Sequence, residues 1–238
     1  MKISIVIPAY NEEKQIGRLV SYLYENAKNH LAEKIIVVDC GSKDKTVEVA
    51  ERAGAKVLAS PKGRAIQMNT GAKTAKGEVL YFVHADTTPP ASFAKDILQA
   101  INEGYEIGCY RFKFNSDKQV LKLNSWVTRF DKIFFRGGDQ TLFVKRKIFE
   151  ELGSYDEKYV IMEEYDFIKK ARKKALFKIM QDDVLVSARK YEMNSYLRVS
   201  FANFIVFSMF RLGASPQKIF DVYKTLIQHP KESFADKR

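Results

Sequence analysis

Short apolar runs alternate with segments of helical periodicity through the N-terminal part of the chain. The runs have the length and composition of strands buried on both faces of a parallel sheet. Between them, apolar residues recur every three or four positions, which predicts amphipathic helices. The predicted strands are 2–7, 34–39, 55–60 and 78–83, and the predicted helices are 16–23, 44–53, 63–76 and one opened by Pro89-Pro90. This alternation predicts an α/β fold with a mostly parallel, doubly wound sheet between two layers of helices.

The pattern changes after residue 104. A further strand is predicted at 105–114 and an amphipathic helix at 118–135, followed by a glycine turn that leads into a short strand and a short helix. Helices are also predicted at 169–178 and 194–213. No repeat or linker separates these parts. We therefore expect one domain over residues 1–190, with halves 1–104 and 105–190, and a helical C-terminal extension over residues 191–238 packed on it.

Polar clusters stand where three of the predicted strands end. They are the segments 8–12, 39–42 and 84–86. In an open parallel sheet, ligands bind beyond the carboxyl ends of the strands. Helix capping explains each cluster alone, but it does not explain Asp39 and Asp86 together. The convergence therefore favours a binding site at this edge.

Composition is that of one globular unit. The chain has 238 residues, 46% of them hydrophobic, which is enough for a sizeable core. The first apolar run is closed by Pro8 and is shorter than the core of a secretory signal. Cys40 and Cys109 form neither a disulfide framework nor a metal-ligand spacing. We therefore expect a cytoplasmic protein, with peripheral attachment to the inner face of the membrane as the alternative.

The charge is strongly basic. The formal net charge is +11, and six basic residues fall within 169–178. Such an excess suits an anionic partner: nucleic acid, a membrane surface or a phosphorylated substrate. Along the basic run, Ile168, Ala171 and Ala175 have the spacing of a buried helix face. The simplest interpretation is therefore that the lysines form the solvated side of a helix.

The familiar glycine-rich phosphate loops are missing from the sequence. Neither GxGxxG after a strand nor GxxxxGK[ST] occurs, so a dinucleotide fold and a P-loop are not supported. A divalent cation held by carboxylate oxygen, with help from Arg or Lys, can neutralise phosphates instead. Asp86, two residues after His84, is a candidate for that cation. An HxD pair by itself is more often a turn than a metal site.

Five segments carry a resemblance to a known family. They read SIVIPAYNEE, VVDCGSKDKT, GRAIQMNTGAKTAKGEVLYFVHADTTP, GGDQTLFVKRKIFEELGSYDE and MEEYDFIKKAR. In this order and spacing they resemble the family 2 glycosyltransferases with the GT-A fold, a three-layer α/β/α architecture. The wording GRAIQMNTGA and HADT, with the tail that begins ARKYEMNSYLR, is similar to the bacterial radical-SAM/selenodomain-associated transferase 2 subgroup. The resemblance implies an enzyme that uses a nucleotide-sugar donor.

The resemblance also implies roles on the donor side. Asp39 would accept a hydrogen bond from the base, most simply uracil, and Arg64 would reach the diphosphate or the sugar. Asp86 matches the metal-binding aspartate of the family's DxD element, whereas His84 replaces its first aspartate. An imidazole ligand favours Mn²⁺ over Mg²⁺. The residues expected to line the base and ribose are Pro8, Ala9, Tyr10, Asn11 and Glu12.

On the acceptor side, Glu164 matches the position where the family usually has its aspartate base, and Glu163 precedes it. Inverting transfer of a hexose would then use Glu164 to take the proton from an acceptor hydroxyl. Asp139 and Gln140 resemble the family's acceptor loop, and Trp126 is expected nearby. The acceptor itself is a lipid or a small molecule, and no motif identifies it.

The segment 194–213 is apolar nearly all round a helix. It is shorter than the roughly 20 apolar residues that a membrane span needs, so we do not expect a transmembrane helix. It is either a buried or homodimer-forming helix, or a helix that lies at a membrane interface.

Two other functions remain as alternatives. A nucleotidyltransferase needs a glycine-rich loop after the first strand, and PAYNEEKQIG does not provide one. A protein without transferase activity would bind a nucleotide sugar, a membrane surface or nucleic acid through its charge. Carboxylates at the strand ends repel phosphate unless a metal is present, so we do not expect a nucleic-acid partner.

Overall fold

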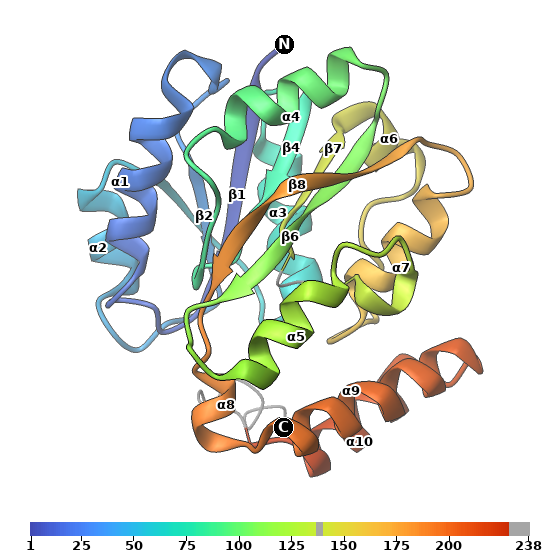
Figure 1. Ribbon diagram of the computed structural model, residues 1–238. Coiled ribbons are helices and arrows are strands. Elements are labelled where there is room, and N and C mark those ends of the chain that lie inside the picture. Colours follow the sequence, from blue (N-terminus) through green and yellow to red (C-terminus); the bar gives the residue numbers. More distant parts are fainter. Residues whose placement is uncertain (137–139, 229–238) are drawn as a thin grey trace.

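An eight-stranded mixed sheet forms the centre of the protein (Figure 1). The computed structural model describes residues 1–136 and 140–228. The strand order is β3-β2-β1-β4-β7-β6-β8-β5. The strands are β1 (Ile3–Ala9), β2 (Ile36–Asp39), β3 (Lys56–Ala59), β4 (Val79–Phe82), β5 (Thr87–Thr88), β6 (Ile107–Phe114), β7 (Leu142–Lys145) and β8 (Phe177–Val186).

Helices cover both faces of this sheet, which confirms the predicted three-layer α/β/α architecture. The apolar sides of α1 and α4 pack with the odd-numbered residues of β1, whereas α3, α6 and α7 pack on the other face with Val6. The helices are α1 (Ile16–Ala27), α2 (Thr46–Arg52), α3 (Arg64–Thr74), α4 (Phe93–Asn102), α5 (Gln119–Val127), α6 (Arg146–Glu151), α7 (Glu163–Ala171), α8 (Lys190–Met193), α9 (Tyr196–Arg211) and α10 (Pro216–Leu226), with 3-10 turns η1 (Lys28–His30) and η2 (Ile133–Phe135).

The N-terminal strands lie as the apolar runs predict. β1 pairs in parallel with both β2 and β4, and β2 pairs in parallel with β3. All residues of β1, β2 and β4 are buried, because helices cover both faces of the sheet. The carboxyl ends of β1, β2 and β4 therefore meet at one edge.

Two predicted helices differ from the structure. The helix expected at 169–178 is wrong in its second half: α7 ends at Ala171, and strand β8 begins at Phe177 and runs parallel to β6. The exposed stretch Gln181–Asp183 hides this strand from pattern analysis. The helix expected at 118–135 ends at Val127 and resumes only as the turn η2.

The buried guanidinium of Arg136 accounts for the early end of that helix. It donates to the backbone carbonyls of Thr128 and Phe130, which takes both oxygens out of a continuing helix. The side chain is completely buried. The segment between α5 and η2 is thus folded back around a single arginine.

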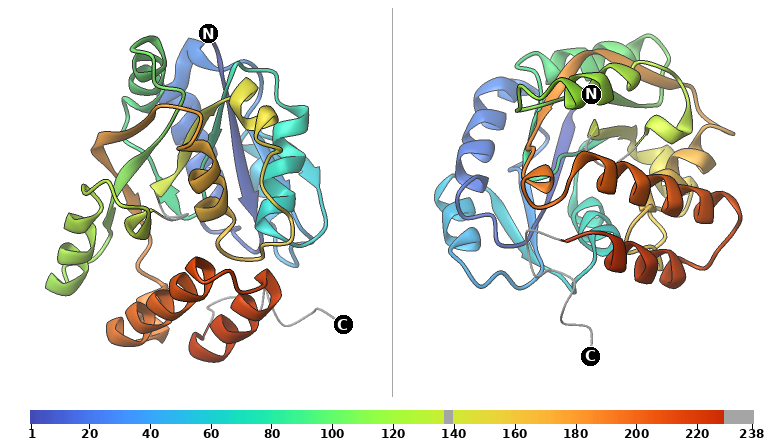
Figure 2. Two further views of the ribbon diagram at one scale, coloured as in Figure 1. Left: turned by 90° about the vertical axis from the view of Figure 1, so that its right-hand side faces the viewer. Right: turned by 60° about the horizontal axis from the view of Figure 1, so that its bottom comes forward.

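The last helices, α9 and α10, form a hairpin beyond the carboxyl edge of the sheet (Figure 2). Ser195 and Ser215 cap their N-termini through side-chain oxygens that accept the amides of Arg198 and Lys218. One face of α9 packs against α10 and against Ile161 and Met162, which precede α7. Within the predicted helix 194–213, the buried residues on this face are Val199, Ala202, Val206 and Phe210.

Gly71 allows α3 to lie directly on the sheet. A Cβ atom at this position would stand 2.3 Å from Cγ1 of Val6 and 3.1 Å from Cγ2 of Val38. We expect Gly71→Ala to lower the free energy of unfolding by about 1–3 kcal/mol, because the β-branched side chains of Val6 and Val38 cannot move aside for the extra methyl group. Urea denaturation measures this loss. Lys73→Ala, an exposed change on the same helix, is the control, and equal stability of both variants would contradict close packing at Gly71.

Candidate functional site

Asn11 ties together the polar loops that follow β1 and β2. Its backbone is left-handed, with φ of 52°, a conformation that asparagine adopts more readily than most residues. Its side-chain oxygen accepts the amide of Lys43 at 2.8 Å, and its own amide donates to the Ser42 hydroxyl at 2.8 Å. The loop 8–12 is therefore held in one shape at the carboxyl edge of the sheet.

Asp39 organises the second of these loops. Its carboxylate accepts the amides of Gly41 at 2.8 Å and Ser42 at 3.0 Å, and it also accepts the Ser42 hydroxyl. The side chain is buried. A carboxylate has about four acceptor positions, so one remains for a further donor. The contact with a nucleotide base stays a prediction.

Arg189 joins two carboxylates that lie far apart in the sequence. Its guanidinium donates to Glu12 and to Asp86, both at 3.4 Å. Sequence analysis did not find this arginine, because it follows β8, which the pattern did not show. β8 itself continues beside the Asp86 loop: the amide of Ser187 donates to the carbonyl of Asp86 at 3.2 Å. A basic residue just after a sheet strand is the signal that would have found it.

Two acidic side chains begin α7 inside the same region. Glu163 and Glu164 are 1% and 4% exposed, and Met162 before them has the left-handed φ of 73° that turns the chain into the helix. A helix N-terminus favours negative charge, which offsets part of the cost of burying two carboxylates. Arg64 supplies a direct partner, since its Nε lies 2.5 Å from Oε1 of Glu163.

Burial raises the pKa of Glu163, and the neighbouring Glu164 adds to this rise, whereas Arg64 opposes it. Glu164 has a different partner: Nε2 of His84 lies 3.3 Å from its Oε1. Burial alone would lower the pKa of His84, but the hydrogen bond and the charge of Glu164 outweigh it and raise the pKa. The adjacent glutamates thus have two different partners, Arg64 and His84.

A cavity of about 730 Å³ brings most of the predicted site residues together. One half is polar and is lined by residues of the strand-end loops and α7. The other half is apolar and is formed by α5, η2 and α9, including Leu123, Phe134 and Phe207. The predicted residues that line it are Pro8, Ala9, Tyr10, Glu12, Arg64, His84, Asp86, Glu163 and Glu164.

Several predicted residues lie away from this lining. Asn11 and Asp39 hold the loops behind it. Gln140 is buried and accepts a hydrogen bond from Arg136 at 3.2 Å. Trp126 is 47% exposed on α5 and packs against Phe130, with ring centroids 4.9 Å apart. Asp139 lies outside the described residues.

The donor atoms for a divalent cation are few. Across residues 1–136 and 140–228, no three His, Cys, Asp or Glu side chains come together as a metal cluster. Asp86 offers one hard carboxylate ligand, whereas Nε2 of His84 faces Glu164. Mg²⁺ and Mn²⁺ in phosphate sites commonly use one or two carboxylates together with phosphate oxygens and water. Asp86 fits such a cation only when a diphosphate completes the ligand set.

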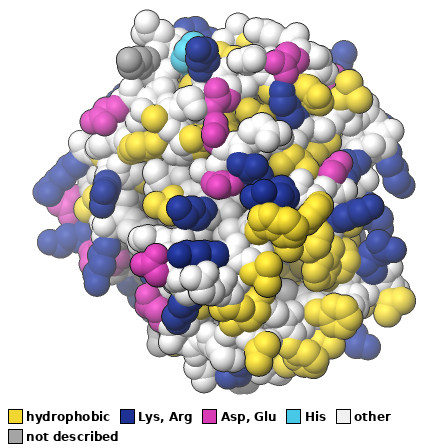
Figure 3. Space-filling view, in the orientation of Figure 1, with side chains coloured by type: hydrophobic (Ala, Val, Ile, Leu, Met, Phe, Trp, Pro, Cys, Tyr) yellow, Lys and Arg dark blue, Asp and Glu magenta, His cyan; other side chains and the backbone are white. Residues whose placement is uncertain are grey.

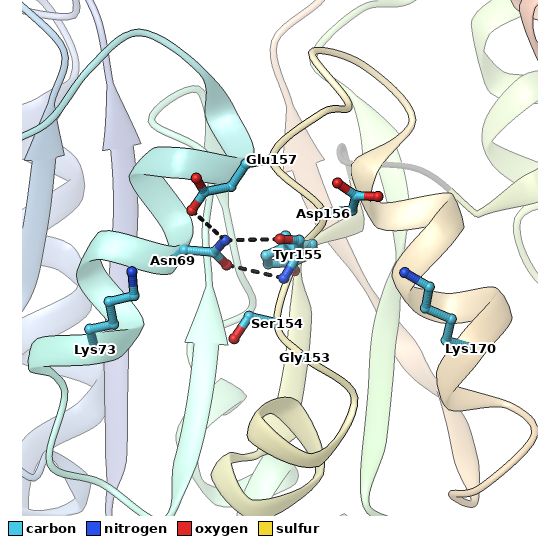
Figure 4. A pocket seen from close by; sticks show the side chains of 8 residues that line it. All are labelled: Asn69, Lys73, Gly153, Ser154, Tyr155, Asp156, Glu157 and Lys170. Atoms are coloured by element: carbon cyan, nitrogen blue, oxygen red, sulfur yellow. Dashed lines mark hydrogen bonds between the residues drawn. The ribbon is translucent and has the colours of Figure 1, made fainter. Parts of the chain in front are cut away.

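A second, smaller hollow of about 400 Å³ lies between α3 and the loop before α7 (Figure 4). Here the Asn69 amide donates to the Tyr155 carbonyl at 2.9 Å and to Glu157 at 3.0 Å, and its oxygen accepts the Tyr155 amide at 3.1 Å. All polar atoms of Asn69 are therefore used within the protein. We therefore interpret this hollow as a structural contact between α3 and the loop before α7 rather than as a binding site.

The sequence pattern of "Glycosyl transferase family 2" matches residues 4–177. The chain belongs to glycosyl transferase family 2. Its relatives include the dolichol-phosphate mannosyltransferase of Pyrococcus furiosus, which is 33% identical over 113 residues, 45% of this chain and 32% of that enzyme. The chain spans less than half the length of the archaeal relatives that it matches.

Two solved structures share the fold of this family 2 member. Staphylococcus aureus TarS 1–349 in complex with UDP-GlcNAc is 20% identical, with 95% of this chain and 71% of TarS covered and a TM-score of 0.64. Glucosyl-3-phosphoglycerate synthase from Mycobacterium tuberculosis, in complex with Mn²⁺, UDP-glucose and phosphoglyceric acid, is 18% identical, with coverages of 90% and 80% and a TM-score of 0.62. These likenesses confirm the predicted GT-A fold.

Proposed function

We propose that this family 2 glycosyltransferase moves a hexose from a nucleoside diphosphate sugar, most simply a UDP-sugar, to an acceptor hydroxyl with inversion. The observation that carries the proposal is the cavity itself, in which cationic side chains and buried carboxylates meet at the carboxyl edge of the sheet. The two solved structures described above each hold a UDP-sugar. Binding of the base by the loop 8–12 and Asp39 is part of the same proposal.

Arg189 and Asp86 would form the diphosphate end of the donor site. In the structure, the guanidinium of Arg189 balances the carboxylates of Glu12 and Asp86. Guanidinium groups bind phosphate through paired, charge-assisted hydrogen bonds. Asp86 would hold Mn²⁺ or Mg²⁺, with His84 as the second predicted ligand, and that cation would supply neutralising charge to the diphosphate.

Glu164 would act as the base. It would accept the proton of the acceptor hydroxyl while that oxygen bonds to the anomeric carbon and the bond from this carbon to the diphosphate oxygen breaks. The products are the glycoside, the nucleoside diphosphate and a protonated Glu164. Glu163 would act as a positioning residue, since its ion pair fixes Arg64 beside Glu164, the proposed general base.

The acceptor would enter through the apolar half of the cavity. Leu123, Phe134 and Phe207 line this half, together with residues of α9. Apolar walls suit an acceptor with a hydrocarbon part better than a free sugar. The Pyrococcus relative is named for a lipid phosphate acceptor. A lipid-linked acceptor is therefore the first class to test, with small molecules second.

A transfer assay tests the proposed function. Purified protein with Mn²⁺ is incubated with a panel of UDP- and GDP-hexoses and with polyprenyl or small-molecule acceptors, and release of the nucleoside diphosphate is measured. Acceptor-dependent release with one donor is expected. Nucleotide-sugar binding without release for any acceptor class would instead favour a binding protein without transferase activity.

Arg189→Met is expected to weaken UDP binding about 10- to 100-fold, because a charge-assisted hydrogen bond contributes roughly 1.5–3 kcal/mol. Calorimetry with UDP and Mn²⁺ measures the change. Arg52→Met is the matched control, since Arg52 is exposed on α2 and pairs with Glu48 in the same helix. Unchanged UDP affinity in Arg189→Met would contradict a diphosphate role for this arginine.

A further inference from the structure

Large apolar side chains are exposed on two neighbouring segments of the chain. The first segment runs from α5 to η2 and the second is α9. All of these side chains are at least 40% exposed, and several exceed 50%. We define the α5–α9 face as Leu123, Trp126, Phe130, Phe134, Leu197, Phe201 and Phe204.

The two segments form one continuous face. The rings of Phe134 and Phe207 meet edge to face with centroids 4.9 Å apart, which joins η2 to α9. On α9, Leu197, Phe201 and Phe204 lie on the side away from the buried Val199 and follow helical spacing. Figure 3 shows apolar side chains gathered over α5 and α9 on one side of the molecule. Such a large exposed apolar surface marks an interaction site.

Basic residues border this face. Arg129 stacks on Trp126, with its guanidinium 5.3 Å from the ring centroid, and Nζ of Lys169 lies 5.4 Å from the ring centroid of Phe210. Phe210 is on the buried side of α9, so the second contact places Lys169, in the last turn of α7, near the C-terminal end of α9. Exposed lysines and arginines in residues 118–135 and on α9 include Lys118, Lys122, Lys132, Arg198 and Arg211, and Lys170, Lys173 and Lys174 are exposed at the end of α7 and just after it.

Both segments of the face contribute residues to the lining of the cavity. Leu123, 60% exposed on α5, belongs both to the face and to the cavity lining, as does Phe134. On α9 the cavity-lining residues Ser200 and Phe207 stand next to the exposed stripe. A molecule embedded in a surface that covers the α5–α9 face therefore has a direct way to Glu164.

We propose that the α5–α9 face docks on the headgroup region of an anionic bilayer and that the acceptor enters the cavity from that bilayer. Entry of the acceptor from the bilayer, the second part of this proposal, rests on the proposed transferase function. No helix in the described parts of the chain is long and apolar enough to cross a membrane. An apolar stripe with a basic border is the pattern of a protein that lies in the interface instead.

Charge argues for a bilayer rather than a second copy of the chain. A two-fold interface places the same patch of both copies together, so the basic borders would face each other. An anionic lipid surface attracts these same lysines and arginines. The net charge of +11 adds to that attraction.

Vesicle sedimentation tests the docking surface. Wild-type protein is mixed with neutral phosphatidylcholine vesicles and with vesicles that also contain phosphatidylglycerol, at low and high salt and without nucleotide. We expect binding to the anionic vesicles that high salt weakens. The triple change Leu197→Ser, Phe201→Ser and Phe204→Ser should reduce the partition coefficient roughly tenfold or more. Val47→Ser, on α2 at the other edge of the sheet, is the matched control.

UDP affinity in the absence of vesicles separates this proposal from the proposed function. The three changed residues do not line the cavity, so the variant should keep wild-type UDP binding and thereby show an intact fold. Equal vesicle partition of wild type and triple variant would overturn the docking surface. A wild-type dimer in light scattering that the triple change dissociates, with no vesicle binding, would overturn it in favour of a second copy.

Discussion

Replacement of Glu164 by glutamine is expected to lower kcat for transfer by about a hundred- to ten-thousand-fold, the usual contribution of a positioned general base. Glutamine keeps the shape of the side chain and its contact with His84, but it cannot take the acceptor proton. UDP affinity should change little, because the proton transfer belongs to the acceptor side. Steady-state kinetics with saturating donor measure the effect.

The matched control for this change is Glu150→Gln, an exposed glutamate on α6, which should leave kcat unaltered. A loss of less than about tenfold in Glu164→Gln would contradict the base role. That outcome would replace the proposed acceptor hydroxyl by an oxygen that is already ionised, as in a lipid phosphate, which needs no base. The experiment therefore also distinguishes the two kinds of acceptor oxygen.

Asp86→Ala is expected to abolish activation by Mn²⁺ and to lower the transfer rate about a hundredfold or more, because metal stabilisation of a leaving group contributes several kcal/mol. The change removes the carboxylate that matches the family's metal ligand. Glu12 remains beside Arg189, so the local charge is not left unbalanced. Rates are measured across a Mn²⁺ titration.

Asp117→Ala serves as the control for that change. Asp117 is fully exposed, and its ion pair with Lys122 is a loose contact of 3.7 Å. Its variant should show the wild-type Mn²⁺ dependence. An unaltered Mn²⁺ dependence in Asp86→Ala would contradict the metal role. It would indicate that Arg189 neutralises the diphosphate without a metal ion.

The N-terminal half of the fold was predictable because its strands are covered on both faces. β1, β2 and β4 consist almost wholly of apolar residues, so each appears as an uninterrupted run that turn residues close. Parallel pairing then requires their carboxyl ends to meet. The polar clusters after β1 and β4 were therefore expected at one edge of the sheet, and the parallel pairing of these strands places them there.

The C-terminal half was less predictable because its strands depend on tertiary pairing. β8 contains the exposed stretch Gln181–Asp183 and pairs with β6 through a register shift between Cys109 and Arg111. The local hydrophobic pattern of β8 contains no information about its pairing with β6. Since β8 was missed, Arg189 at its end was missed too, although it contacts both Glu12 and Asp86.

The environment of His84 could not come from local sequence either. The family resemblance implies a metal ligand at His84, but the residue that Nε2 of His84 contacts is Glu164, 80 positions later in the chain. That contact depends on where α7 begins, and α7 begins after the left-handed Met162. Burial of two adjacent glutamates at a helix start is likewise a property of the folded chain.

Titration of UDP into the purified wild-type protein by calorimetry, with Mn²⁺, with Mg²⁺ and with EDTA, tests whether the cavity is a nucleotide-sugar site. We expect binding that either metal strengthens and EDTA removes, with Mn²⁺ the stronger of the two. GDP in place of UDP checks the choice of base. No binding of any nucleoside diphosphate under any of these conditions would contradict the assignment of this cavity as a nucleotide-sugar site.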